Sequence, residues 1–440
     1  MAAVPRQASL MRRTGAARAM LCLLLLALAS ACHATPAADN SRVVIRTEQL
    51  SSELELAVTT HAADGDYLLL WIAASYGFRE RHAALTTDLV RAGFEIWQAD
   101  LADALFLPRG SASMRKLDGE HVADLVQIAH RLTGKQVVLV SGSYGAIPVL
   151  RGARHWQSRN PARRELAGAV LFTPNLYSGI PPLGTPPEYV PIVHATTIPV
   201  WILQASRNSN RWQLSQLVEN LRGGGASVYV EMLRGATALF YEEDSDLATL
   251  GYLQSLPQSF KRAAPLLANA PMPLSAAPLP ATRRTIAGSG LDSELQPYRG
   301  ERSAQPIRLE DVTGRHWDVS DYRGRVTVVN FWATWCPPCV KEIPSLNRLR
   351  QSLADTPFEL ISVNYAQRPD EVAKFSEKVN VDFPVLLDSD GRVSAQWGVI
   401  AFPSTFVIGP DGRIQYGVNA AIHWDSPQVI ERLRVLAAPR

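Results

Sequence analysis

The chain is poor in cysteine, with four among 440 residues: Cys22, Cys32, Cys336 and Cys339. A structural zinc site usually needs four cysteine or histidine ligands, often arranged as two closely spaced pairs. Only Cys336 and Cys339 are closely spaced after the N-terminal segment, and no histidine with ligand spacing lies near them. The scarcity of cysteine therefore argues against a zinc ribbon and leaves one isolated pair of thiols.

Net charge is also nearly absent once the N-terminus is set aside. The formal charge is +3, and residues 1–31 contribute four arginines and no acidic residue. The rest of the chain carries 40 basic and 41 acidic residues. Proteins that bind nucleic acid usually present an excess of basic side chains. We therefore expect no nucleic-acid partner.

The apolar segment near the N-terminus, residues 20–29, is too short to span a membrane, which takes about 20 apolar residues. Arg12, Arg13 and Arg18 precede it, and the small residues 29–31 follow it. This order is typical of a secretory signal peptide. We expect residues 1–31 to be a signal peptide and the mature protein to be extracytoplasmic, in the periplasm.

Cys32 directly follows the sequence LASA at 28–31. This arrangement resembles a bacterial lipobox, although the position three residues before the cysteine is Ala29 where that pattern prefers leucine. Lipidation of Cys32 would use the thiol and hold the protein at a membrane surface. Ordinary cleavage after Ala34 would remove Cys32 instead, and the sequence leaves both outcomes open.

A chain of this length predicts two domains. In the first, residues 40–262, apolar strands alternate with amphipathic helices, which predicts a mostly parallel sheet covered on both faces. The expected strands are 43–47, 54–59, 67–73, 94–99, 137–140, 169–172, 200–204 and 228–233, and the expected helices are 82–92, 119–132, 144–155, 212–221 and 246–261.

The turn between the strand 137–140 and the following helix reads SGSYG at 141–145. Small residues on both sides of Ser143 permit the tight bend of a nucleophile elbow. With Asp100 closing an earlier strand, this domain resembles the α/β-hydrolase family. The family pattern is G-x-S-x-G, from which the chain departs at Ser141.

The catalytic partners of that family are missing at the expected places. The loop after 200–204 has Asn208 where the family has an acid, and the loop after 228–233 has Thr237 where it has histidine. A serine hydroxyl without a base is a poor nucleophile. We expect Ser143 to be vestigial. Two alternatives stay open: a serine esterase that recruits a histidine (His121, His130, His155 or His194) and uses the redox domain as an accessory, or a pure binding module.

Alanine, proline and leucine dominate residues 263–280, and residues up to 302 show no convincing periodicity. Proline-rich segments are stiff and extended. We expect a linker over 263–302 and a second domain over 303–440.

In the second domain, Cys336 and Cys339 follow the apolar strand 326–331 and open a helix, in the sequence WCPPC. A helix N-terminus offers unpaired N–H groups and a positive dipole end, which favour a thiolate. Two intervening residues allow the thiols to form a reversible disulfide. The pair is therefore suited to thiol-disulfide exchange with another protein.

The expected elements continue with strands 307–309, 316–319, 326–331, 358–364, 384–387, 405–408 and 414–417, and helices 338–353, 369–379, 393–397 and 427–436. This order is thioredoxin-like. The residues NFWATWCPPC at 330–339, Glu342, Pro344 and GVIAFPSTF at 398–406 make about 135 residues similar to the TlpA/ResA/CcmG-like thiol-disulfide oxidoreductases.

The resemblance implies roles for individual residues. Cys336 would attack, Cys339 would resolve, and Glu342 would assist proton transfer, its alternative being a solvated helix charge. Pro403 matches the family's cis-proline, and Trp335, Phe402 and Pro403 would contact the substrate. Asn330 stands where cytosolic thioredoxins have a buried aspartate.

The resemblance also implies the partners. They would be disulfide-bearing exported proteins, such as apocytochrome c, and a membrane thiol donor of electrons. No cofactor beyond the redox disulfide would be needed.

Overall fold

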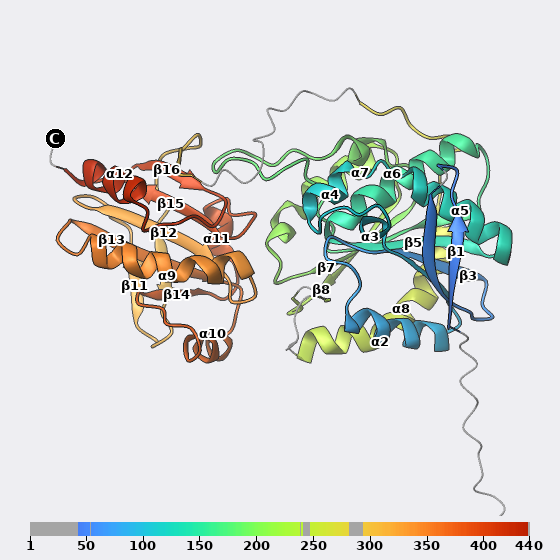
Figure 1. Ribbon diagram of the computed structural model, residues 1–440, viewed down its shortest axis with the longest axis horizontal. Helices are drawn as coiled ribbons and strands as arrows, with labels where there is room; N and C mark the ends of the chain where they lie inside the picture. The colour runs from blue at the N-terminus through green and yellow to red at the C-terminus, as the bar shows by residue number, and fades with distance from the viewer. Residues whose placement is uncertain (1–42, 53, 238, 241–246, 281–293, 439–440) are drawn as a thin grey trace, which may run out of the picture. The chain divides into compact units, whose positions relative to one another are not determined.

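The computed structural model describes residues 43–52, 54–237, 239–240, 247–280 and 294–438 (Figure 1). The expected signal peptide and Cys32 lie outside these residues. The described part contains two regions with separate main sheets, the first region (residues 43–280) and the second region (residues 294–438). None of its helices is both long enough and apolar enough to cross a membrane.

The described residues of the first region form an eight-stranded sheet in the order β1-β2-β4-β3-β5-β6-β7-β8. β2 pairs antiparallel with β1 and β4, and the pairs from β4 through β8 are parallel, which confirms the predicted mostly parallel sheet. The strands are β1 (Val43–Gln49), β2 (Glu55–His61), β3 (Tyr67–Ile72), β4 (Glu95–Ala99), β5 (Gln136–Gly142), β6 (Leu166–Phe172), β7 (Val200–Ala205) and β8 (Val228–Leu233).

Helices cover both faces of this sheet. One apolar cluster includes side chains of α2 and α8, and the other includes side chains of α5, α6 and α7. The helices are α2 (Glu80–Arg91), α3 (Leu101–Ala104), α4 (Ser111–Lys116), α5 (Glu120–Thr133), α6 (Ala146–Arg159), α7 (Leu214–Gly223) and α8 (Leu247–Asn269), with short 3-10 turns η1 (Ser143–Gly145), η2 (Pro191–Ala195) and η3 (Ser209–Gln213).

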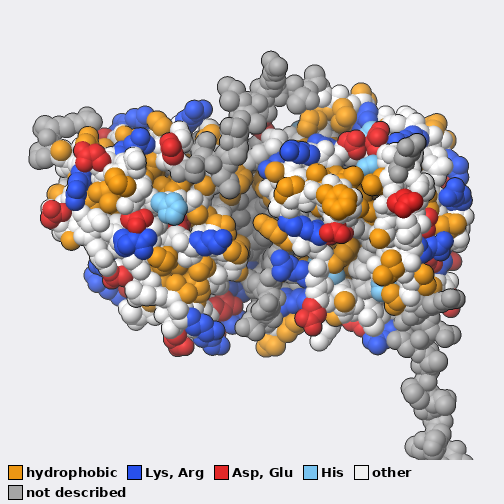
Figure 2. Space-filling view, viewed as in Figure 1, with side chains coloured by type: hydrophobic (Ala, Val, Ile, Leu, Met, Phe, Trp, Pro, Cys, Tyr) orange, Lys and Arg blue, Asp and Glu red, His pale blue; other side chains and the backbone are white. Residues whose placement is uncertain are grey.

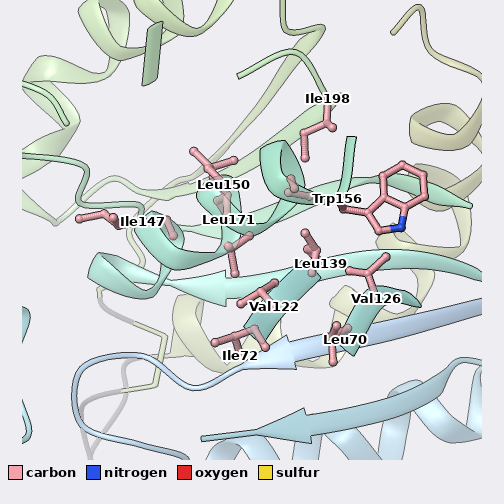
Figure 3. Packing of buried hydrophobic residues seen from close by; sticks show 14 of the residues in the cluster. Leu70, Ile72, Val122, Val126, Leu139, Ile147, Leu150, Trp156, Leu171 and Ile198 are labelled. Carbon is pink, nitrogen blue, oxygen red and sulfur yellow. The ribbon is translucent and has the colours of Figure 1, made fainter. Parts of the chain in front are cut away.

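The central strands are buried on both sides, because their residues alternate between the two apolar clusters. Leu70 and Ile72 of β3 face the cluster drawn in Figure 3, whereas Leu69 and Trp71 belong to the other one. Figure 3 also shows Trp156 of α6 beside the same layer. Continuous apolar strands of this kind are what the sequence of residues 67–73 predicted.

The proline-rich segment departs from the sequence-based expectation. Helix α8 continues to Asn269 with two prolines inside it, although a linker was expected from residue 263. After the helix, Arg154 Nε donates to the Ala277 carbonyl at 2.9 Å, and an Arg164 guanidinium nitrogen donates to the Met272 carbonyl at 3.0 Å. Proline lacks an N–H group, but the carbonyls of such a segment remain free to accept these bonds. Residues 263–280 are therefore packed on the first region.

The second region has a six-stranded sheet in the order β14-β13-β12-β15-β16-β9 and a separate hairpin of β10 and β11. β12, β13 and β14 are parallel, and β15 is antiparallel to β12. The short β9 lies within the expected linker. The elements are β9 (Gln296–Pro297), β10 (Ile307–Glu310), β11 (His316–Val319), β12 (Val326–Trp332), α9 (Pro337–Ser352), β13 (Phe358–Tyr365), α10 (Pro369–Ser376), β14 (Val385–Asp388), α11 (Arg392–Gln396), β15 (Ser404–Ile408), β16 (Ile414–Val418) and α12 (Pro427–Ala437).

Charged side chains of both signs are interspersed on the face shown in Figure 2. Among the residues coloured there, no large area of a single charge is visible. This distribution agrees with the near balance of basic and acidic residues in the sequence.

Gly152 lets α5 and α6 pack closely, and this contact can be tested. A Cβ atom on Gly152 would lie 2.5 Å from Val122 Cβ and 2.9 Å from the Gly119 carbonyl oxygen. Gly152→Ala should therefore destabilise the first region by about 1–3 kcal/mol, as overpacked cores do. Gly251→Ala is the control, because nothing lies within 4 Å of its Cβ position in α8. There alanine should stabilise by about 1 kcal/mol. Urea unfolding measures the stability of both variants. If Gly152→Ala stabilised the protein as much as Gly251→Ala does, the close packing of α5 and α6 would be contradicted.

Candidate active site

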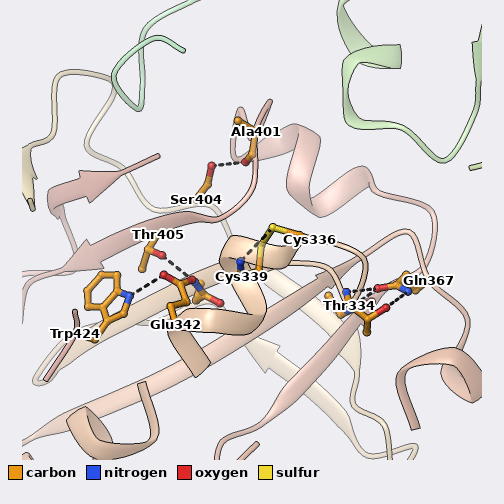
Figure 4. Close-up of a disulfide and its surroundings, with 11 residues drawn as sticks. Thr334, Cys336, Cys339, Glu342, Gln367, Ala401, Ser404, Thr405 and Trp424 are labelled. Atoms are coloured by element: carbon orange, nitrogen blue, oxygen red, sulfur yellow. Dashed lines mark hydrogen bonds between the residues drawn. A yellow bond between two sulfur atoms is a disulfide. The ribbon is translucent and has the colours of Figure 1, made fainter. Parts of the chain in front are cut away.

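Cys336 and Cys339 lie where β12 gives way to α9, and they are joined by a disulfide (Figure 4). Cys336 is the N-cap residue, and the Cys339 backbone N–H points at Cys336 Sγ across 3.3 Å. Pro337 occupies the first helical position, where a missing N–H group costs nothing. The first thiol is therefore placed at the positive end of a helix, as the sequence predicted.

Glu342 lies one turn further along α9 and is 2% exposed. Asn330 Nδ2 donates to Glu342 Oε1 at 2.8 Å, and Trp424 Nε1 donates to Glu342 Oε2 at 3.1 Å. Asn330 also donates to Thr405 Oγ1 at 2.9 Å. These contacts exclude the alternative in which Glu342 is a solvated surface charge.

Burial raises the pKa of Glu342 from 4.5 to about 7, because a carboxylate loses its hydration in the core. The hydrogen bonds from Trp424, Asn330 and the Ile422 backbone act in the opposite direction and favour the charged form. Desolvation is the larger effect. A carboxyl group with this pKa can both take up and release a proton near neutral pH.

Trp335 and Phe402 form an apolar surface beside the disulfide. Trp335 is 38% exposed, and its ring meets Phe402 edge to face with centroids 5.8 Å apart. Phe402 packs against the apolar cluster that contains Cys336 and Cys339. The peptide bond between Phe402 and Pro403 is cis, as predicted.

Comparisons with known proteins agree with this geometry. Residues 301–417 match the model of the AhpC/TSA family. The chain is 36% identical to thiol-disulfide oxidoreductase ResA of Geobacillus thermodenitrificans over 113 residues, which are 26% of this chain and 65% of that protein. It is 31% identical to ResA of Bacillus thuringiensis over 125 residues, which are 28% of this chain and 72% of that protein. The chain belongs to the ResA family of thiol-disulfide oxidoreductases.

The match does not extend over the full length of these relatives. The chain spans 65% of the Geobacillus thermodenitrificans protein and 59% of ResA from Bacillus subtilis. Among solved structures, the thiol:disulfide interchange protein DsbE from Chlorobium tepidum is 26% identical, with a TM-score of 0.28. That alignment covers 32% of this chain and 96% of the DsbE chain.

Two residues of the site in this family member were not singled out from the sequence. Trp424 is completely buried and contacts Glu342 across 82 positions of sequence. Gln367 accepts a hydrogen bond from the Thr334 backbone N–H at 2.8 Å, across 33 positions. Neither contact has a local sequence signal, because each depends on how distant strands pair.

Ser143 lies in η1, between β5 and α6, with a φ of 47° that side-chain-bearing residues rarely adopt. The sharp turn expected from the sequence is therefore present. Ser141, the departure from the family pattern, is buried, and its hydroxyl donates to the Ile72 carbonyl at 2.8 Å. A Cβ on Gly145 would come within 2.2 Å of Ser141 Oγ, so the turn requires glycine there.

The residues at the expected positions of the catalytic acid and base form local hydrogen bonds instead. Asn208 caps η3 and accepts a bond from Asn210 N at 3.2 Å, and Thr237 N donates to Thr249 Oγ1 at 3.1 Å. Asp100 caps α3 and pairs with Arg109 at 2.6 Å. Among the described residues, no histidine or carboxylate is hydrogen-bonded to the Ser143 hydroxyl. His130, one recruitment candidate, instead contacts the Lys135 carbonyl at 2.8 Å.

The described ranges contain no group of three or more histidine, cysteine, aspartate or glutamate side chains that could hold a metal ion.

The raised pKa of Glu342 makes stability depend on pH in a testable way. Between pH 4.5 and about 7 the folded protein holds a proton on Glu342 that the unfolded chain has lost. Stability from this group is thus complete below pH 4.5 and falls as the pH rises through 7. Relative to Glu342→Gln, the oxidised wild type should lose up to roughly 3 kcal/mol between pH 4.5 and pH 8.

Urea unfolding at each pH, read by pulse proteolysis of the second region, measures this difference. In Glu342→Gln the amide faces two N–H donors, and this lowers stability by the same amount at every pH. The result is therefore the change of the stability difference with pH, not its absolute size. Burial raises the pKa of Asp388 in both proteins alike, so its contribution cancels in the comparison. Parallel pH curves for wild type and Glu342→Gln would show that Glu342 does not titrate in this range.

Proposed function

We propose that the protein is an extracytoplasmic thiol-disulfide oxidoreductase that reduces disulfide bonds of exported proteins. The observation that carries this proposal is the Cys336–Cys339 disulfide at the start of α9, one turn from the buried Glu342. The membership of the chain in the ResA family supports the same reaction class.

In the proposed reaction, the reduced Cys336 thiolate attacks one sulfur of a substrate disulfide, and the other substrate sulfur leaves as a thiolate. Cys339 then attacks the mixed disulfide, which forms the Cys336–Cys339 bond and releases the first substrate sulfur. Two electrons pass from the enzyme's thiols to the substrate. The Cys339 backbone N–H and the N-terminus of α9 stabilise negative charge on Cys336.

Glu342 would serve the second step. It lies three residues after Cys339 on α9, which places the two side chains on the same face of the helix. With a pKa of about 7, its carboxylate can accept the proton that Cys339 must lose before it attacks.

Trp335, Phe402 and Pro403 are the proposed contacts with the substrate chain. The exposed indole of Trp335 and the Phe402 ring offer apolar area next to the disulfide. The cis bond before Pro403 lies directly ahead of β15 (Ser404–Ile408), and the substrate chain is proposed to run along this segment. Disulfide-bearing exported proteins such as apocytochrome c, and a membrane thiol donor that restores the dithiol, are the proposed partners.

The first region is proposed to have an α/β-hydrolase-like fold that lacks hydrolytic activity. The strand order with β2 antiparallel and the turn at Ser143 after β5 support the fold. The residues Asn208 and Thr237, at the places of acid and base, support the loss of activity. A signal peptide at 1–31 and a lipid on Cys32 remain proposals for export and membrane attachment.

Trapping of reaction intermediates tests the roles of the two cysteines. Cys339→Ser should accumulate a mixed disulfide with a substrate, because the resolving thiol is gone, whereas Cys336→Ser should form none. Mass spectrometry maps each adduct to its cysteine in the full chain, and the double variant gives the background. Adducts on Cys339 in the Cys336→Ser protein, with none in Cys339→Ser, would reverse the assigned roles.

A fluorophosphonate probe tests the proposed inactivity of Ser143. Without a base, the hydroxyl should react no faster than other serines, so the protein should remain unlabelled. In a serine protease with a Ser-His-Asp triad, loss of the acid alone lowers turnover about ten-thousandfold, and here the base position is changed as well. Stoichiometric labelling that disappears in Ser143→Ala would instead establish a serine hydrolase with a recruited histidine.

A further inference from the structure

The loop that carries Cys336 is short, and the side-chain amide of Gln367 is hydrogen-bonded to it. Residues 333–336 connect β12 to α9, and within the loop the Cys336 N–H donates to the Ala333 carbonyl at 3.2 Å. Thr334 forms two hydrogen bonds to Gln367. Its backbone N–H donates to Gln367 Oε1 at 2.8 Å, and its hydroxyl accepts from Gln367 Nε2 at 2.6 Å (Figure 4).

Gln367 is itself fixed to the sheet. Asn364 Nδ2 donates to Gln367 Oε1 at 3.1 Å, and Asn364 is completely buried at the end of β13. Only residues 366–368 separate β13 from α10, so the loop that holds Gln367 has little freedom. The contacts thus form a continuous chain from a buried strand, through one amide side chain, to the residue two positions before Cys336.

We propose that Gln367 is a positioning residue that holds the 333–336 loop in the orientation in which α9 stabilises the Cys336 thiolate. This stabilisation needs the Cys336 sulfur to lie against the first N–H groups of α9, since a helix terminus acts over only about one turn. Loss of both Thr334 anchors would let the loop rotate away from that arrangement. The inference rests on the proposed function, in which Cys336 is the attacking thiol.

Arg368 on the loop of Gln367 and Glu342 on α9 are held by other contacts. On its own loop, Arg368 Nε pairs with Asp370 at 3.0 Å, and the Arg368 N–H donates to Glu371 at 2.8 Å. On α9, Glu342 is held by Asn330 and Trp424. A neutral replacement of Gln367 therefore changes the geometry of the loop without changing the charges around Cys336.

The experiment measures alkylation of Cys336 by iodoacetamide in the reduced full-length chain as a function of pH, read from the Cys336 peptide by mass spectrometry. Gln367→Met keeps the volume and removes all three hydrogen bonds. It should slow alkylation below pH 7 by between about threefold and tenfold and move the reactive limb to higher pH, as expected from the loss of one or two hydrogen bonds. Thr334→Val should act in the same direction with a smaller effect.

A matched control separates positioning from stability. Asn347 joins α9 to the 380–382 loop by the same pair of bonds, donating to the Asn380 carbonyl at 2.9 Å and accepting from Asp382 N at 2.9 Å. Asn347→Leu should lower the melting temperature as much as Gln367→Met while leaving the Cys336 pH profile unchanged. Gln367→Met should change the alkylation profile less when Thr334→Val is already present than it does alone, because both substitutions remove the same contact.

A wild-type pH profile in folded Gln367→Met would overturn the inference, as would strictly additive effects of the two changes. If Gln367→Met does not fold, Thr334→Val decides by the same profile. Failure of the proposed function is distinguishable, because it would appear as missing substrate adducts in Cys339→Ser while Cys336 alkylation still depended on Gln367.

Discussion

The register of three paired strands is the constraint on which the active site depends. β12 and β13 are parallel with Trp332 opposite Asn364, so both strands end at the same edge of the sheet. β15 runs antiparallel to β12 with Phe331 opposite Ser404, so the segment before β15 reaches the same edge. The cysteine loop, the Gln367 loop and the cis-Pro403 segment therefore meet there. A slip of one residue in either pairing would turn Asn364 or Thr405 to the opposite face and separate these groups.

Two opposing effects determine the pKa of the buried Glu342. Both oxygens of Glu342 accept from groups that can only donate, Asn330 Nδ2 and the Trp424 indole, and such partners favour the carboxylate. Burial favours the neutral acid more strongly, and the resulting pKa of about 7 lies well above the ordinary value of 4.5. An aspartate in place of Asn330 would add a second negative charge to this pocket and raise the pKa of Glu342 further. With asparagine at position 330, Glu342 is the one carboxyl group of this pair of positions that titrates.

Features that depend on a short stretch of sequence were predictable, whereas contacts between residues distant in the sequence were not. The cysteine pair, its place at a helix start and the cis bond before Pro403 were predictable, because each depends on a short motif. The burial of Glu342 was not decided by sequence, since its partner Trp424 lies in the segment before α12. Proline-rich composition favours a separating linker over residues 263–280, but it does not exclude packing against a domain. In the structure, Pro257 and Pro265 lie inside α8, and arginine donors hold the carbonyls that follow.

The turn at Ser143 illustrates why a strained motif is weak support for catalysis when considered alone. Its φ of 47° carries a cost of about 1–3 kcal/mol that the surrounding structure must offset. Packing around the turn can offset this cost, and no catalytic role is needed to explain it. Ser141 Oγ fills the space next to Gly145 and donates a hydrogen bond to the Ile72 carbonyl of β3. A Cβ on Gly142 would lie 3.3 Å from the Phe172 carbonyl oxygen, so the space beside β6 is also tight there. The close approach of β5, β3 and α6 therefore preserves the elbow even where Asn208 and Thr237 have replaced the groups that would activate its serine.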